Sequence, residues 1–399
     1  MSELKYRLYC FVHHIVKRLL GRATPRTVGK IIQFPALKMG VKPEKACQLW
    51  SEFIQKSVIS SDEFNGNLYA GYIGESKEWC LPSWIWTNAA SVREFCFVGK
   101  LDKAKALAAK LAARQLDCGG WVVRNDYDNQ GAIPMLAPND SAYIANNAFL
   151  TLYEKIRDET YLNIARRCAD WIIETARPDG MVYVGYNVRD QKWNKNYVIV
   201  DVGFTGGLFS RLVEFTHEEK YRYFLKQFIG RYIELFYLPQ NRGFCTSIDM
   251  NDRPQGGVFG RGQAWALEGL IPAYKVLKDE HIKQVIDDTI ENLLCVQNSD
   301  GAWAYNFTKP LLGNDCKSIS VIAKNMMEWY EVSRDERIRK SAEKALNWCY
   351  KHTVIEGEAT GGIFSFCMEG AIVQNLYTSC AFVYASAYAI ELQKMLKQG

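Results

Sequence analysis

The sequence of 399 residues contains only five histidines, and neither an H-E-x-x-H segment nor a C-x-x-C pair is present. These spacings are the usual signs of a zinc site, so we expect a protein that uses no metal and no other cofactor. The 12 cysteines are scattered through apolar stretches, and no secretory leader is visible. Such a pattern is typical of reduced thiols in the cytoplasm, which is the predicted location.

Long apolar runs are also missing. None approaches the roughly 18 residues that a membrane-spanning helix needs, and the sequence holds no recognisable nucleic-acid-binding module. Hydrophobic residues make up 48% of the chain and charged residues 23%, which is ordinary for a globular protein with a large core. We therefore expect neither an integral membrane protein nor a nucleic-acid partner.

The positive charge is concentrated at the N-terminal end. Residues 1–42 hold nine Lys or Arg and one acid, a net charge of +8, so the remaining chain carries 5 − 8 = −3. Apolar residues from Leu4 to Leu20 recur at helical spacing, which predicts a basic amphipathic helix. Such a helix can lie on an anionic membrane surface, or it can pack on the body of the protein or on a second subunit. The oligomeric state stays open.

A glycine followed by an aromatic or bulky residue recurs at Gly119, Gly180, Gly243, Gly301 and Gly362, in steps of 61, 63, 58 and 61 residues. A fixed period of this kind indicates a repeat architecture. Each repeat has an amphipathic helical stretch before the glycine and a second, less charged stretch after it. The second stretches carry many small residues suited to burial, and they are residues 83–98, 141–156, 202–216, 262–277, 318–332 and 378–392.

Six such stretches predict an all-α protein with the architecture of an (α/α)6 toroid, a barrel of six helical hairpins. The alternative is an open helical solenoid, and six units favour closure because a closed ring has no exposed ends. Residues 43–57 would supply a further outer helix. We expect two parts, a basic amphipathic N-terminal extension of residues 1–42 and a barrel domain of residues 43–399.

Charged and aromatic residues share one position in the repeats, at the start of each less charged helix. After the first repeat their spacing is 61, 60, 56 and 60 residues. The set comprises Trp84 and Trp86, Asp140, Asp201, Arg261, Lys317 and Tyr377. In a toroid these helix starts meet at one mouth, where the helix N-termini favour an anionic ligand.

Two carboxylates that face one cleft are the usual equipment for acid/base chemistry on a glycosidic substrate. Asp140 and Asp201 would form this pair, and their proximity would keep one of them protonated. Arg261 offers a planar fork that suits a substrate carboxylate, and Trp265, one turn later, would form an apolar wall. The alternative for either Asp is the role of a helix N-cap.

Residues 260–270, with the sequence GRGQAWALEGL, resemble the R-G-Q-A-W signature of glycoside hydrolase family 88, the unsaturated glucuronyl hydrolases. Family 105, the unsaturated rhamnogalacturonyl hydrolases, has a variant of this signature. The resemblance implies an (α/α)6 barrel that acts on an oligosaccharide with an acidic, unsaturated sugar by hydration of its 4,5-double bond. It implies Asp201 as the acid/base, Asp140 as its partner, and Arg261, Gln263 and Trp265 around the uronate.

The chain departs from this family at one position that matters for the chemistry. The family usually has a histidine between its second Asp and the signature. Here that interval holds only His217, and Cys245 and Thr246 stand nearer to the expected place.

Three other readings compete with this one. Residues 115–121 and 297–303 match the Q-x-x-x-G-x-W motif of terpenoid cyclases, but the acid cluster of a cyclase is missing, so we expect turns that place a Gln and a Trp between repeats. A sugar epimerase of the N-acylglucosamine 2-epimerase type would need histidine bases, which the helix starts lack. The non-catalytic alternative is a toroid that binds a cell-surface glycan near the membrane through residues 1–42.

Overall fold

A computed structural model describes residues 37–60, 65–74, 77–80, 85–125, 133–308, 314–369 and 376–398. Most of the basic extension and Trp84 lie outside these residues. The chain divides into two compact units, of which unit 1 comprises Met1–Ser61, Leu68–Pro82 and Val296–Gly399, and unit 2 comprises Asp62–Asn67 and Ser83–Cys295. Both units are mainly helical, as the periodicity predicts, and each is described by itself.

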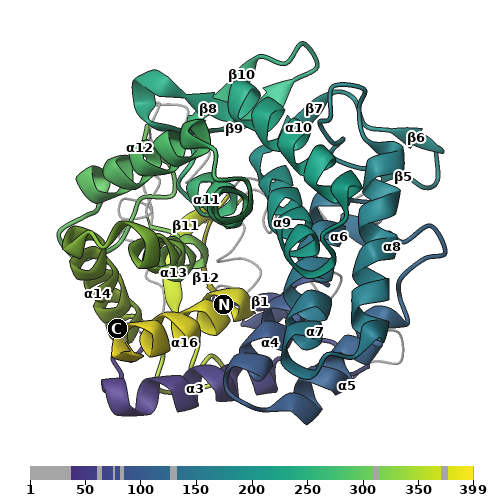
Figure 1. Cartoon of the computed structure of the whole chain (residues 1–399). Helices are drawn as coiled ribbons and strands as arrows, with labels where there is room; N and C mark the ends of the chain where they lie inside the picture. Colours follow the sequence, from purple (N-terminus) through teal and green to yellow (C-terminus); the bar gives the residue numbers. More distant parts are fainter. Residues whose placement is uncertain are drawn as a thin grey trace. The chain divides into compact units, whose positions relative to one another are not determined.

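Unit 2 contains four predicted inner helices with buried residues on most sides. Helix α4 is Trp86–Phe97, and a second helical stretch consists of α6 (Pro138–Ile144), the π-helical turn η1 (Ala145–Leu150) and α7 (Thr151–Ile156). The third consists of the 3-10 turn η2 (Val200–Gly203) and α9 (Phe204–Thr216), and the fourth is α11 (Gly260–Leu277). Helices α9 and α11 lie side by side (Figure 1).

The predicted outer helices of unit 2 are amphipathic and bury one face. They are α5 (Leu101–Ala112), α8 (Glu159–Thr175), α10 (Glu219–Phe236) and α12 (Glu280–Val296). In α8 the buried residues Leu162, Ala165, Cys168 and Ile172 follow the helical period, which is what places their side chains on one face.

Two physical constraints explain why the recurring position is a glycine, and both are present at Gly119. Its φ of 102° lies in the region that side chains disfavour, and a Cβ there would lie 2.3 Å from the carbonyl oxygen of Arg167 on α8. Gln115 Nε2 donates to the carbonyl oxygens of Gly119 (2.8 Å) and Ile164 (3.0 Å), and Trp121 is fully buried. This confirms the predicted turn in which a Gln and a Trp lie between repeats.

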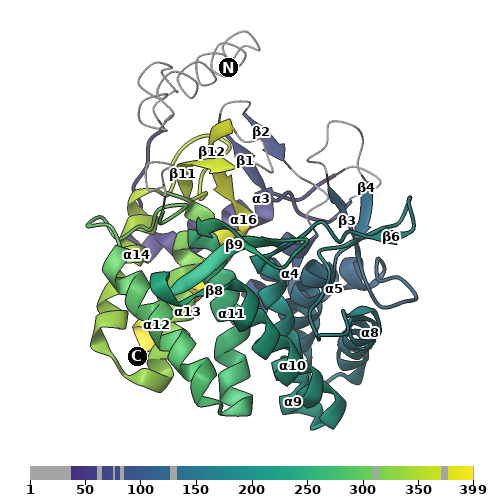
Figure 2. The same cartoon turned by 90° about the horizontal axis from the view of Figure 1, so that it is seen from above.

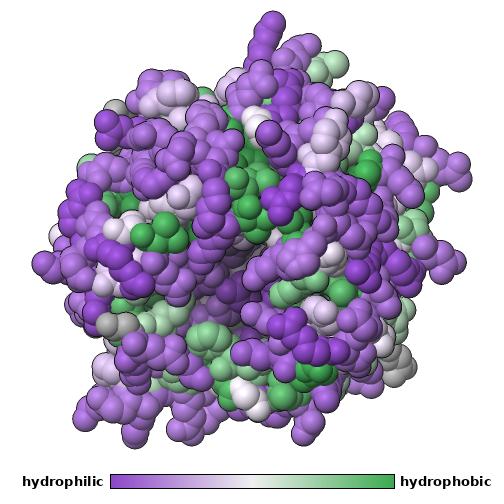
Figure 3. Space-filling model, viewed as in Figure 1, coloured by the Kyte–Doolittle hydropathy of each residue, from purple (hydrophilic) through white to green (hydrophobic). Residues whose placement is uncertain are grey.

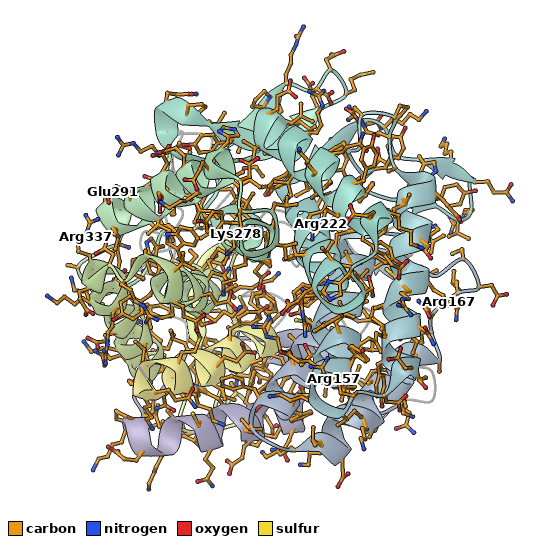
Figure 4. All side chains as sticks on the ribbon, viewed as in Figure 1. Arg157, Arg167, Arg222, Lys278, Glu291 and Arg337 are labelled. Carbon is orange, nitrogen blue, oxygen red and sulfur yellow. The ribbon has the colours of Figure 1, made fainter. Side chains whose placement is uncertain are left out.

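The opposite ends of these helices carry a second recurring turn. Arg157, His217 and Lys278 each follow an inner helix of unit 2 with a φ between 53° and 56°. A cation at a helix C-terminus is favoured by the helix dipole, which offsets part of the cost of the left-handed conformation. Figure 4 marks Arg157 beside α7 and Lys278 beside α11, and the face seen in this view is mostly hydrophilic (Figure 3).

Short strands gather at the other end of the helices of unit 2 (Figure 2). One antiparallel sheet has the order β3 (Val122–Asn125), β4 (Ile133–Leu136), β5 (Tyr186–Asn187) and β6 (Lys192–Trp193). The other has the order β10 (Pro254–Val258), β9 (Gly243–Asp249) and β7 (Tyr197–Ile199), and β8 (Tyr237–Leu238) also pairs with β9.

Unit 1 joins segments that are far apart in the sequence. Its helices are α3 (Pro43–Lys56), α13 (Cys316–Ser333), α14 (Glu336–Lys351) and α16 (Val383–Gln398). Its sheet has the order β11 (Phe364–Glu369), β12 (Leu376–Phe382), β1 (Gly71–Ile73) and β2 (Glu78–Cys80). Gln393 on α16 donates to the carbonyl oxygen of Pro43 across 2.8 Å, so α3 is the outer helix predicted for residues 43–57.

The start of the last inner helix differs from the prediction. Residues 378–392 were expected to be helical with Tyr377 at the helix start, but residues 376–382 form β12 and the helix begins at Val383. The strand is favoured because β12 pairs with both β11 and β1, which local periodicity does not reveal. Tyr377 therefore lies on a strand, six residues before the helix.

Within the described ranges, no helix is both long enough and apolar enough to cross a membrane. In the same ranges, no three His, Cys, Asp or Glu side chains gather as metal ligands. The ten cysteines whose side chains the structure describes form no disulfide with one another. Six of them are buried, whereas Cys118 and Cys295 are exposed.

Candidate functional site

The three charged residues expected at the centre of the site all lie in the first turn of an inner helix of unit 2. Asp140 is the third residue of α6, Asp201 is the second of η2, and Arg261 is the second of α11. The N-cap positions belong to Ala137, Ile199 and Phe259, and none of these three makes a side-chain capping bond.

The N-cap alternative for the two acids is therefore excluded by their positions. The chain does use Asp as a cap elsewhere, since Asp158, Asp315 and Asp335 accept hydrogen bonds from backbone N–H groups of α8, α13 and α14. Asp140 and Asp201 lie beyond the cap, inside the first turn, where a carboxylate meets the positive end of the helix dipole. Both side chains are partly exposed.

The short strands of unit 2 place these residues. Strand β4 ends four residues before Asp140, β7 ends two residues before Asp201, and β10 ends three residues before Arg261. Because β7 and β10 both pair with β9, the segments that lead to Asp201 and Arg261 belong to one sheet.

Glycines bring the backbones of α9 and α11 into direct contact below these residues. A Cβ on Gly269 would lie 2.1 Å from the carbonyl oxygen of Gly203, and one on Gly206 would lie 3.0 Å from that of Gly269. Gly262, next to Arg261, leaves room for the Val200 side chain, which would be 2.8 Å from a Cβ there. The distance between the Asp201 and Arg261 helices is thus set by residues that have no side chain.

The two acid-bearing segments are joined by a direct hydrogen bond. Asn139, which precedes Asp140, donates from Nδ2 to Oδ2 of Asp201 across 2.8 Å. Asn139 is 5% exposed, and the bond spans 62 positions of the sequence. Asp201 is therefore in contact with the residue that directly precedes Asp140 in the chain.

Arg261 lies against two aromatic rings. It is 3% exposed, and its guanidinium carbon is 5.9 Å from the ring centre of Phe259 and 5.8 Å from that of Trp265. Cation–π contacts of this kind hold a guanidinium in place without consuming its hydrogen-bond donors. Trp265 thus lies on the same face of α11 as Arg261, one turn later, and its role as an apolar wall stays a prediction.

An aromatic row runs one turn below the acids across four inner helices. Neighbouring ring centres are 6.4 Å (Trp86–Tyr143), 4.8 Å (Tyr143–Phe204) and 5.9 Å (Phe204–Trp265) apart. The row begins and ends with the two half-buried tryptophans, and its middle members are buried. Tyr143 and Phe204 were not among the predicted site residues, although their positions three residues after each Asp could have indicated them.

Gln263 has a structural role. Its side chain is fully buried, accepts from the backbone N–H of Phe244 (2.8 Å) and donates to the carbonyl oxygens of Phe244 (2.9 Å) and Phe259 (2.8 Å). These bonds tie the start of α11 to strand β9. Gln263 therefore holds Arg261 in place, and we do not keep it as a substrate contact, which is a correction to the sequence-based assignment.

Among the residues that the structure describes, the histidine that the resemblance called for has no equivalent near Asp201. His217 is exposed at the far end of α9. Cys245 is buried on β9, where burial raises the pKa of its thiol to about 11, and burial also raises the pKa of Tyr232 well above its ordinary value. Tyr232 donates to the carbonyl oxygen of Val200 across 2.8 Å and supports the turn that carries Asp201.

Lys317 and Tyr377 belong to unit 1. Lys317 lies in the first turn of α13, is 4% exposed, and its Nζ is 4.6 Å from the ring centre of Phe382. Asp315 caps the same helix by accepting from the Lys317 N–H and from Ser318 Oγ. The register predicted for Lys317 is thus confirmed, and its contact with substrate stays a prediction, as does that of Tyr377.

The chain is similar to known proteins in sequence and in fold. Residues 83–390 match the sequence family described as Glycosyl Hydrolase Family 88. The fold is similar to that of an unsaturated glucuronyl hydrolase from Bacillus sp. GL1, responsible for the degradation of glycosaminoglycan (TM-score 0.71, 15% identity, 90% of this chain and 97% of that chain). It is similar to an unsaturated glucuronyl hydrolase specific for heparin (TM-score 0.70, 14% identity, 89% and 97%).

A sugar epimerase from a ruminal bacterium is nearly as similar (TM-score 0.69, 16% identity, 90% of this chain and 98% of that chain). No curated protein matches the chain by sequence. Identities this low show a shared fold, and a fold hosts more than one activity. The chemistry must therefore be argued from the side chains of the site.

Proposed function

Because the chain belongs to glycosyl hydrolase family 88, we propose that it hydrolyses oligosaccharides whose terminal sugar is a 4,5-unsaturated uronic acid. The observation that carries this proposal is the hydrogen bond between Asn139 and Asp201, which joins the segments of the two acids. Arg261 between its two rings supplies a cation at the start of the neighbouring helix.

The proposed reaction assigns one role to each of these side chains. Asp201 donates its proton to C4 of the double bond while a water oxygen bonds to C5, and a proton of this water passes to the carboxylate. The hydrated ring then opens and releases the neighbouring sugar. Asp140 assists Asp201 as a nearby carboxylate, and no step needs a metal.

Substrate recognition is assigned to the residues that surround the acids. The Arg261 fork suits the planar uronate carboxylate, and Trp265 and Trp86 at the two ends of the aromatic row suit the apolar faces of sugar rings. Trp84, Lys317 and Tyr377 complete the proposed set. The closed barrel of six hairpins and a location in the cytoplasm are part of this proposal.

The test is the ultraviolet absorbance of the unsaturated uronate, followed on a panel of oligosaccharides that polysaccharide lyases produce. The wild type should remove this absorbance, and Asp201→Asn should abolish the loss. Asp158→Asn is the matched control, because Asp158 caps helix α8 at an exposed position and should leave the rate unchanged. A folded wild type that removes no absorbance from any member of the panel would contradict the proposal.

A second candidate function rests on the absence of a histidine near Asp201 among the described residues. The protein would then bind a cell-surface glycan without turning it over, close to a membrane that residues 1–42 contact. Titration calorimetry would show binding of an acidic oligosaccharide with no loss of absorbance. Removal of residues 1–42 would release the protein from anionic vesicles, and turnover of any substrate would exclude this candidate.

A further inference from the structure

The bond between Asn139 and Asp201 has a defined polarity. An ionised carboxylate has no hydrogen to donate, so the amide must present its Nδ2 to Oδ2 of Asp201, at 2.8 Å. A rotated amide would bring its own oxygen against the carboxylate, and two acceptors would face each other. Asn139 therefore favours the ionised form of Asp201.

The same bond distinguishes the two oxygens of Asp201. When the side chain is neutral, Oδ2 is the better acceptor for the Asn139 N–H if the proton is on Oδ1, so the bond favours that position of the proton. A general acid works when its proton points at the reacting atom, and a proton spread over two oxygens points there only part of the time.

The other end of the Asn139 amide points to a ligand. Its Oδ1 is buried, and within the described part of the chain no group donates to it. A buried acceptor left unpaired in this way destabilises the folded protein. That cost is offset if an O–H group of the bound substrate or of the attacking water donates to Oδ1 during the reaction.

We propose that Asn139 is a positioning residue that fixes the acidic proton of Asp201 on Oδ1 and accepts an O–H bond from the reacting species. This inference rests on the proposed function. It adds to that function a residue that sequence reasoning did not single out, because the partner of Asn139 lies 62 positions away.

Other titratable or charged groups on the elements packed around Asp201 must be considered in any test by pH. They include Asp140 on α6, Arg261 and Glu268 on α11, Arg211 on α9, Tyr232 on α10 and Cys245 on β9. Burial raises the pKa of Cys245 to about 11 and the pKa of Tyr232 well above its usual value, so neither changes charge near neutrality. Arginine keeps its charge throughout.

The first experiment is the pH profile of kcat/KM for Asn139→Leu, which removes both polar ends of the amide at similar volume. Loss of the N–H donor makes the ionised form less favourable, so the alkaline limb should move to higher pH by about one unit. The value of kcat should fall by up to about 100-fold, the lower end of the roughly 10²- to 10⁴-fold that a positioned general acid contributes, because Asp201 itself is still present. An unchanged alkaline limb would overturn the proposal.

Asn187→Leu is the matched control. Asn187 donates from Nδ2 to Oδ2 of Asp190 across 2.9 Å, the same type of pair, on the exposed β5–β6 hairpin. Its substitution should leave both kcat and the pH profile unchanged. A variant with Asn139→Ser, which leaves space for water, separates the two sources of the O–H group: partial recovery of kcat relative to Asn139→Leu indicates water, and no recovery indicates a substrate hydroxyl.

A second measurement does not depend on turnover. The free energy of unfolding is measured for Asn139→Leu, Asp201→Asn and the double variant, at neutral pH and in acid. The proposal predicts a coupling between the two positions that shrinks as Asp201 is protonated. Coupling without turnover would reject the proposed reaction but support the interaction between Asn139 and Asp201. Zero coupling at neutral pH would reject the role of Asn139 itself.

Discussion

Gly269 approaches Gly203 so closely that a Cβ on Gly269 would lie 2.1 Å from the carbonyl oxygen of Gly203. Gly203 ends the turn that carries Asp201, and Gly269 lies two turns into the helix that carries Arg261. The separation of the acid from the cation therefore depends on the absence of one methyl group. This contact gives the most direct test of whether the helix spacing matters for the reaction.

Gly269→Ala should push α9 and α11 apart and should destabilise the protein by about 1–3 kcal/mol, as overpacking of a close contact does. Urea unfolding measures this loss, and kcat/KM on the same samples should fall. Gly230→Ala is the control, because Gly230 lies in α10 with nothing within 4 Å of an added Cβ. That substitution should stabilise the protein by about 0.5–1 kcal/mol. Equal stability changes at the two positions would show that the helices adjust freely.

The hairpin between β9 and β10 is held by a cluster of four charges. Arg177 donates to Asp179 and Asp252 at 2.8 Å each, and Arg231 donates to the same two carboxylates at 2.9 and 2.8 Å. Hydrogen bonds from Arg177 hold the pKa of Asp252 below its usual value. The stabilising contribution is thus present above the pKa of the unfolded chain, at about 4, and is lost as the pH falls through the folded value.

Asp252→Asn should lower the free energy of unfolding by about 1–2 kcal/mol at neutral pH, since hydrogen bonds to charged groups are worth about that much. The difference from the wild type should begin to shrink below about pH 4, where Asp252 of the unfolded wild type takes up a proton, and should be lost as the pH falls through the lower pKa of folded Asp252. Glu356→Gln removes the exposed partner of Lys38 and should change stability by less than about 0.5 kcal/mol. A difference that persists at low pH would contradict the ionic origin of the effect.

The π-helical turn after Asp140 is supported from the next inner helix. Arg211 on α9 donates to the carbonyl oxygens of Asn146 and Leu150 at 3.0 Å each, and to Glu154 at 2.8 Å. The wider π turn leaves carbonyl groups that the arginine pairs. Together with the Asn139 bond, this contact joins the two acid-bearing helices at both ends.

Arg211→Met should therefore cost about 1–3 kcal/mol, because it removes the arginine's hydrogen bonds to two part-buried carbonyl oxygens. Chemical denaturation measures the loss, and activity should fall with it because the register of Asp140 depends on this turn. Arg222→Met is the control, since Arg222 is more exposed and its contact with the Val276 carbonyl oxygen is long, at 3.5 Å. A loss in Arg222→Met as large as in Arg211→Met would argue against a specific role of the π turn.

Features that depend on local chemistry could be predicted from the sequence. Gly119 and Gly301 need both a positive φ and a missing Cβ, so no other residue suits them and the period is visible in the printed sequence. The starts of the inner helices at Asp140, Asp201, Arg261 and Lys317 follow from that period. Features that depend on distant partners could not be predicted.

Three residues illustrate that limit. Tyr377 lies in a segment whose apolar pattern suits helix and strand alike. Pairing with β11, in which Tyr377 is opposite Met368, and with β1, some 300 residues earlier, favours the strand. Gln263 was assigned to the substrate from its motif, yet its amide binds the backbone of β9. Asn139 carries no local signal of its role, since the role is defined by Asp201.

The contact between Gln393 and Pro43 spans 350 positions of the chain. At a synthesis rate of about 5–20 residues per second, the ribosome needs about 20–70 seconds between the two. During this time α3 is present without α16, the helix against which it packs, and the segment from Ser83 to Cys295 is completed before α16 is made. Unit 2 can thus fold during translation, whereas α3 has to avoid aggregation until α16 has been synthesised. The yield of folded protein should therefore depend on the rate of translation and on the supply of chaperones.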